Sequence, residues 1–167
     1  MEIPTFKTER LLLRAATMED WPAYEALMLS DRTKYMGGPY DQKGAWGWFC
    51  HETASWALFG HGGLVMEHQE TGASLGVIAI NSGPLFPEDE LGWFVYPEVE
   101  GKGYALEAAR ELRRWAFEVR GLETLVSYIY PKNTRSSRLA ERLGCVVDEA
   151  AEPQDPGDLV FRHPGPV

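Results

Sequence analysis

The sequence predicts a mixed α/β domain, and three observations support this prediction. The chain has 167 residues, which suits one domain with a substantial hydrophobic core. Short apolar runs typical of strands alternate with longer stretches whose apolar residues recur at helical spacing. Apolar residues make up 44% and charged residues 25%, which indicates an ordinary globular protein. Since the chain contains no internal repeat or linker, residues 1–167 are expected to form a single domain.

The expected elements follow the order β-α-α-β-β-β-α-β-α-β-β. Apolar runs bounded by turn residues predict seven strands, at residues 10–14, 64–67, 74–81, 90–96, 125–130, 145–148 and 159–162. Helical spacing predicts four helices, at about residues 17–30, 41–59, 103–120 and 134–143.

The second and third helices have apolar stripes that name their expected buried residues. The second helix carries one face made of Trp46, Phe49, Cys50, Thr53 and Trp56, so Cys50 is expected to be buried. The third helix carries a stripe made of Ala105, Ala109, Leu112, Ala116 and Val119, with Gly121 expected as its C-terminal cap.

The net charge of the chain limits the kinds of partner that it is expected to bind. A net charge of −9, from 16 basic and 25 acidic residues, argues against a nucleic-acid partner, which needs a basic surface. A cationic substrate such as an amine is compatible with this charge. The alternative is that the negative surface only keeps the protein soluble.

Metal and membrane sites are not expected. Cys50 and Cys145 have no spacing that suggests a disulfide framework or a zinc site, and the histidines form no HxxxH pair. The first residues lack the apolar run of a signal peptide, and no stretch approaches 18 apolar residues. A cytoplasmic location and no membrane partner are therefore expected.

The segment ELGWFVYPEVEGKGYALEA combines a strand, a glycine turn and the start of a long helix. The first N–H groups of a helix lack internal partners and favour negative charge, while Gly101 and Gly103 let the backbone approach an anion. This pattern predicts a phosphate site, although a simple turn is the alternative. Neither GxxxxGKS nor GxGxxG is present, so the P-loop and the dinucleotide fingerprint do not apply.

Several motifs in a fixed order carry a family resemblance. EGKGYALEA resembles the coenzyme loop of the GNAT N-acetyltransferases, in the RimJ/RimL-type branch. TERLLLRAATMED is similar to that branch's opening, TxRLxLRxxxxxD, and NTRSSRLAERLGC resembles its NxxSxxLxxxLGF element. The resemblance covers nearly the whole chain. It implies the GNAT fold: a mixed, twisted sheet of six to seven strands with about four helices, splayed between strands 4 and 5.

The resemblance implies acetyl-CoA as cosubstrate. The backbone around Phe94 and Val95 would hold its pantetheine arm. Its pyrophosphate would take the amides of Gly101, Lys102, Gly103, Tyr104 and Ala105. The family often has Gln or Arg where this chain has Glu98. Glu98 is therefore expected to point to solvent, and the grip on the pyrophosphate to rest on the amides and Lys102.

The resemblance also implies that an amine attacks the thioester directly. Glu90 is the candidate base, acting through a water, and strand alternation places it on the same face as Gly92 and Phe94. The alternative is that Glu90, with Glu88 and Asp89, belongs to a solvated acidic turn.

Three further residues, all later in the sequence than Glu90, complete the candidate site. Asn133 would contact the pantetheine, and its alternative role is to cap the following helix. Ser136 would protonate the departing thiolate, with Tyr130 as the other candidate acid.

Trp46, Trp48 and Trp56 are candidates for the floor of an acceptor pocket, or else belong to the core. Cys145 is expected in the core.

Two functions remain open. The first is an N-acetyltransferase acting on a protein N-terminus, a polyamine, an amino acid or an antibiotic amine. The alternative is a catalytically silent acyl-CoA-binding regulatory module, and a longer acyl-CoA is a further variant. The family makes a homodimer plausible.

Overall fold

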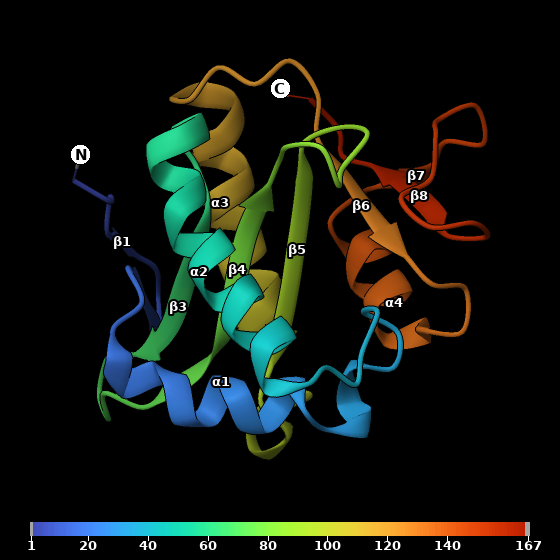
Figure 1. Ribbon diagram of the computed structural model, residues 1–167. Helices are drawn as coiled ribbons and strands as arrows, with labels where there is room; N and C mark the ends of the chain where they lie inside the picture. Colours follow the sequence, from blue (N-terminus) through green and yellow to red (C-terminus); the bar gives the residue numbers. More distant parts are fainter. Residues whose placement is uncertain (1, 166–167) are drawn as a thin grey trace.

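One mixed β-sheet with helices on both faces forms the framework of the protein (Figure 1). The computed structural model describes residues 2–165. The strands are β1 (Phe6–Lys7), β2 (Leu11–Arg14), β3 (Gly63–His68), β4 (Ser74–Asn81), β5 (Glu90–Val95), β6 (Val126–Ile129), β7 (Val146–Val147) and β8 (Leu159–Arg162). The α-helices are α1 (Trp21–Met28), α2 (Gln42–Phe59), α3 (Tyr104–Glu118) and α4 (Thr134–Arg142), and the 3-10 turns are η1 (Met18–Asp20), η2 (Asp31–Thr33) and η3 (Pro97–Val99).

The sheet consists of two parts that separate along its middle. Its strand order is β1-β2-β3-β4-β5-β6-β8-β7. All neighbouring strands are antiparallel except β5 and β6, which are parallel and share one residue pair, Glu90 with Val126. Beyond this pair β5 and β6 diverge, as expected for strands 4 and 5 of the sequence. The eighth strand, β1, was not predicted because it is only two residues long.

Helices pack on the sheet where their apolar faces predict. Ala109, Leu112 and Ala116 of the buried stripe of α3 pack against one face of the sheet, and Ala105, also buried, lines the cleft described below. On the other face, α1 and α2 pack Tyr24, Met28, Ala45 and Phe49 against Val77 and Ala79 of β4 (Figure 1). The first and second helices therefore cover the sheet face opposite α3.

Three details of the helix predictions are wrong. Cys50 is exposed: α2 buries Phe49 and Trp56 of the predicted face together with Ala45 and Ser55, so the buried side is rotated away from Cys50. Val119 is 65% exposed, because α3 ends at Glu118 and the chain turns away before completing the stripe. Gly121, with φ of +75°, lies beyond the residue that caps α3.

A chain of side-chain hydrogen bonds bridges the sheet where β5 and β6 begin to diverge. The Ser127 hydroxyl donates to the carbonyl oxygen of Leu91 at 2.5 Å and lies 2.9 Å from Nε2 of His163. Nδ1 of His163 lies 3.2 Å from Sγ of Cys145. Burial lowers the pKa of His163 to about 3, so the ring is neutral. Nε2 therefore donates to Ser127, and the Cys145 thiol donates to Nδ1. The core position expected for Cys145 is confirmed.

Candidate active site

A cleft of about 1150 Å³ occupies the opening between β5 and β6. It extends from β4 and β5 to the start of α4, and α1 and the η2 segment line one of its walls. Glu90, Tyr130, Asn133 and Ser136 all line it. The structure thus brings the expected catalytic residues to one cleft from three separate elements.

Glu90 is buried at the start of β5, so the alternative of a solvated acidic turn is wrong for this residue. The β4–β5 register places it opposite Asn81, whose side-chain amide donates to its Oε2 at 2.9 Å. Burial raises the pKa of Glu90 to about 7, and the Asn81 hydrogen bond partly offsets this rise. A carboxyl group with this pKa can exchange a proton near neutral pH, as a general base must.

Gly92 keeps space open beside that carboxylate. A Cβ on Gly92 would lie 3.3 Å from Oε2 of Glu90 and 3.3 Å from Nδ2 of Asn81, which is tighter than an ordinary contact. Glycine therefore lets the Glu90 carboxylate lie over the strand on the cleft side.

The edge of β5 that faces the opening is defined by which backbone groups point away from β4. The amide of Tyr96, directly after β5, donates to the carbonyl oxygen of Leu75 in β4. The direction in which the backbone amides point alternates from one residue to the next along a strand. The backbone groups of Leu91, Trp93 and Val95 therefore face the opening. Ser127 already binds the Leu91 carbonyl, which leaves Trp93 and Val95 as the edge that can pair with an extended ligand. Phe94, by contrast, presents its backbone to β4 and its ring to Tyr24, at 5.6 Å between centroids.

The loop after β5 has the backbone expected of an anion site. Gly101 and Gly103 have φ of +75° and +81°, values that favour glycine. Gly103 is the N-cap of α3 and provides no side-chain cap, so the first amides of the helix, from Tyr104 and Ala105, are not satisfied by a capping side chain. Arg10 anchors the loop, because its Nη1 donates to the carbonyl oxygen of Lys102 at 2.8 Å. Glu98 is exposed, in agreement with the expectation that it points to solvent.

The residues at and before the start of α4 have structural roles that are compatible with contacts to a ligand in the cleft. Asn133 caps the helix, since its Oδ1 accepts from the amide of Ser136 at 3.3 Å. Ser136 is partly buried and lines the cleft. The ring of Tyr130 stacks on Tyr35 from the segment after η2, with centroids 5.3 Å apart.

The three tryptophans of α2 have different environments. Trp48 lines the cleft, whereas Trp46 is 43% exposed and does not. Trp56 is buried in the core and donates from Nε1 to the carbonyl of Gly63 at 2.9 Å. Trp48 is therefore the only one of the three that lines the cleft.

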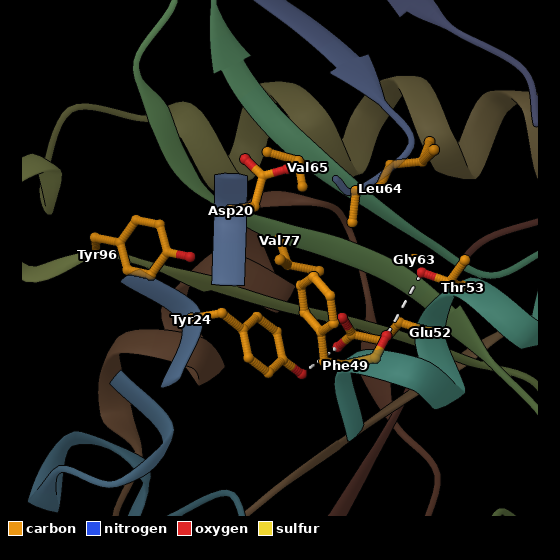
Figure 2. A pocket seen from close by; sticks show the side chains of 11 residues that line it. Asp20, Tyr24, Phe49, Glu52, Thr53, Gly63, Leu64, Val65, Val77 and Tyr96 are labelled. Atoms are coloured by element: carbon orange, nitrogen blue, oxygen red, sulfur yellow. Dashed lines mark hydrogen bonds between the residues drawn. The ribbon is translucent and has the colours of Figure 1, made fainter. Parts of the chain in front are cut away.

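A second carboxylate, Glu52, reaches the cleft from α2 and was not predicted. Figure 2 shows the Tyr24 hydroxyl turned towards Glu52, to which it donates at 3.2 Å. Burial raises the pKa of Glu52 to about 8. α2 comes this close to the sheet because of two glycines: a Cβ on Gly63 would lie 2.6 Å from Cβ of Glu52, and one on Gly62 would lie 2.5 Å from its carbonyl oxygen.

Residues 2–165 contain no group of three or more His, Cys, Asp or Glu side chains that could hold a metal ion. None of the helices in this part of the chain combines the length and the apolar character needed to cross a membrane.

The open sheet and the glycine loop beside it define the fold class of the GNAT acetyltransferases. The sequence matches the family model of the acetyltransferase (GNAT) domain over residues 10–146. The chain belongs to this family, and it is an acyltransferase of the GNAT N-acetyltransferase type.

Named relatives agree with this assignment. An acetyltransferase structure from Agrobacterium tumefaciens C58 is 53% identical, with a TM-score of 0.95 over 98% of this chain and 95% of that one. An uncharacterized N-acetyltransferase of Bacillus subtilis, YnaD, is 28% identical over 82% of this chain and 79% of its own. RimL, a ribosomal L7/L12 alpha-N-protein acetyltransferase solved with coenzyme A, has the same fold, with 17% identity and a TM-score of 0.71 over 95% of this chain and 96% of that one.

Proposed function

We propose that the protein transfers the acetyl group of acetyl-CoA directly to a primary amine of a protein N-terminus or a small molecule. The observation that carries the proposal is the buried Glu90 carboxylate, with a pKa raised to about 7, at the point where β5 and β6 open. RimL, with the same fold, is named for acetylation of a protein N-terminus.

The described residues fit an acyl-coenzyme A. The pantetheine arm is an extended chain with amide groups, and the β5 edge at Trp93 and Val95 offers the free backbone groups that such a chain pairs with. The amides of residues 101–105 and the uncapped start of α3 fit the pyrophosphate. When bound, acetyl-CoA supplies the acetyl thioester. Asn133 lies at the same cleft and would contact the pantetheine.

Glu90 addresses the main obstacle to acetylating an amine, which is protonation. A lysine-like amine, with pKa near ~10.4, is free only about one part in ~2,500 at pH 7, whereas an α-amine near ~8 is about a tenth free. Glu90 in its ionised form takes a proton from the amine, directly or through a water. Such a positioned base accelerates a reaction typically by about 10²–10⁴-fold.

Ser136, which lines the cleft, is the proposed donor of a proton to the departing sulfur. It stands in the first turn of α4, and its backbone is fixed by the Asn133 cap. Tyr130 is the second candidate, although its ring is covered on one face by Tyr35.

The test is amine-dependent release of coenzyme A thiol from acetyl-CoA across a panel of N-terminal peptides, polyamines, amino acids and aminoglycosides. We expect release with at least one of these classes, together with a product heavier by one acetyl group in mass spectrometry. Binding of acetyl-CoA without turnover of any amine would favour the silent coenzyme-binding module. Failure of acetyl-CoA to bind or to raise the Tm would contradict the proposal altogether.

A further inference from the structure

A three-residue ion-pair cluster stands beside the glycine loop. Glu100 directly precedes Gly101, and its carboxylate is bound by Arg32 from η2 and by Arg135 from α4, the latter with Nη1 2.5 Å from Oε1. Glu100 is the most covered of the three, with 19% of its side chain exposed. Two cations from opposite walls thus converge on one carboxylate.

This cluster lies at the phosphate end of the cleft. Arg32, Glu100 and Arg135 all line the cleft, and Glu100 is adjacent to the loop whose amides fit the pyrophosphate. The η2 segment is held across the opening by the stacking of Tyr35 on Tyr130 at the end of β6. The arginines therefore face the same space as the uncapped start of α3.

Charge on the loop itself is unfavourable for an anion. The sequence PEVEGKG places two carboxylates, Glu98 and Glu100, and one cation, Lys102, around the glycines, and the whole chain carries −9. A coenzyme with a diphosphate and a 3′-phosphate brings several negative charges, so further cations are needed near the loop. Guanidinium groups bind carboxylate and phosphate with the same two-pronged geometry.

We propose that Arg32 and Arg135 are the cationic half of the coenzyme's phosphate site, and that Glu100 occupies them in the ligand-free enzyme as a phosphate oxygen would. This inference rests on the proposed function. Phosphate binding exchanges the carboxylate partner of the arginines for a phosphate. Glu100 therefore competes with the ligand, and its charge opposes binding.

The first experiment measures the dissociation constant of coenzyme A by calorimetry for the wild type and for Arg32→Gln, Arg135→Gln and Glu100→Gln. We expect each arginine variant to bind about tenfold more weakly, because it loses a charge-assisted contact. Glu100→Gln is expected to bind about threefold or more tightly, because the competing carboxylate is gone. Arg138→Gln is the matched control, since Arg138 is exposed one turn further along α4 and does not line the cleft.

Two shortened ligands locate the contact. A loss that persists with 3′-dephospho-CoA assigns the arginines to the diphosphate, and a loss that disappears assigns them to the 3′-phosphate; both outcomes support the inference. Pantetheine, which has no phosphate, should bind the wild type and both arginine variants equally. Unequal binding of pantetheine would mean that the arginines only shape the cleft, and would overturn the inference.

The outcome separates this inference from the function on which it rests. If the wild type does not bind coenzyme A, the proposed function and the inference fail together. If it binds, but Arg32→Gln and Arg135→Gln match Arg138→Gln, or Glu100→Gln binds more weakly, only the inference fails. Far-ultraviolet circular dichroism and Tm confirm that each variant is folded.

Discussion

Two partly or fully buried carboxylates reach the same cleft from different supports. Glu90 begins β5 at the place where the sheet opens. Its carboxylate accepts a hydrogen bond from the Asn81 side-chain amide and lies in the space that Gly92 leaves free. Glu52 projects from α2 where Gly62 and Gly63 bring that helix close to β3, and its partner is the Tyr24 hydroxyl. The comparison shows that burial raises both pKa values, but only Glu90 adjoins a strand edge that can hold a ligand.

The largest effect is expected from Glu90→Gln, which keeps the shape of the side chain but removes the proposed base. We expect kcat/KM to fall by about 10²–10⁴-fold. In the wild type, the pH profile of kcat/KM should show an inflection near pH 7, because the base acts in its ionised form. This inflection should be absent from the variant, whose kcat/KM should rise only as the amine itself loses its proton at higher pH. Steady-state kinetics between pH 5.5 and 9 measure both effects. An unchanged kcat/KM would remove Glu90 from the mechanism.

Ser136→Ala tests the proposed proton donor at the start of α4. We expect kcat to fall about 10²-fold, the low end for a general acid, because a thiolate is a comparatively good leaving group. Ser137→Ala is the control, since the Ser137 hydroxyl is buried without a hydrogen-bond partner among the described residues. Full activity of Ser136→Ala together with loss in Tyr130→Phe would transfer the role to Tyr130.

Gly92→Ala tests the space beside Glu90. The added methyl group would press on Oε2 of Glu90 and Nδ2 of Asn81, so we expect kcat to fall about tenfold through a displaced carboxylate. Gly47→Ala is the matched control, because a Cβ at this position in α2 meets no atom within 4 Å. That control should keep its activity and gain up to about 1 kcal/mol of stability from higher helix propensity. Equal activity of the two variants would contradict the role of Gly92.

The smallest effect on activity is expected from Glu52→Gln, which should change kcat/KM by less than about tenfold. Its effect is on stability. The pKa of Glu52 is raised to about 8 in the folded protein, so the wild type loses stability as pH rises towards 8, whereas the neutral variant does not. Between pH 5.5 and 8.5 the variant should gain on the order of 3 kcal/mol relative to the wild type.

Urea unfolding at the two pH values measures this difference. Glu149→Gln, in an exposed loop, is the control and should show no such trend. A wild type and a Glu52→Gln variant with parallel pH profiles would show that the Glu52 carboxyl is not perturbed by burial.

The sequence predicts the sheet and helices well because their patterns are local. The strand, glycine turn and helix of residues 90–118 follow from alternation, positive-φ glycines and an apolar stripe. The wrong burial of Cys50 has a physical cause: Gly44 and Gly47 carry no side chains, so the apolar face of α2 is poorly defined by sequence.

The parts of the site that were not predicted depend on contacts between distant segments. Arg32 and Arg135 acquire their shared partner only when η2 and α4 meet across the opening. The alternation of residues along a strand shows that the backbone groups of Phe94 and Val95 point to opposite edges of β5. It does not show which of the two edges faces the opening between β5 and β6. The answer depends on which edge of β5 pairs with β4. In the structure the free edge carries the backbone groups of Trp93 and Val95, and not those of Phe94 as the sequence had suggested.

The hydrogen-bond chain from Cys145 through His163 and Ser127 to Leu91 has a consequence for the spacing of β5 and β6. Elsewhere in a sheet the backbone ladder sets the spacing of neighbouring strands, at about 4.8 Å. At the closed end of the cleft a serine hydroxyl, oriented by a neutral imidazole, links the two strands beside their single backbone pair. At this end of the cleft, the distance between β5 and β6 therefore depends on the side chains of Ser127 in β6 and of His163 directly after β8. Substitutions of Ser127 or His163 would therefore change the spacing of β5 and β6 at this end of the cleft without altering any residue of the glycine loop.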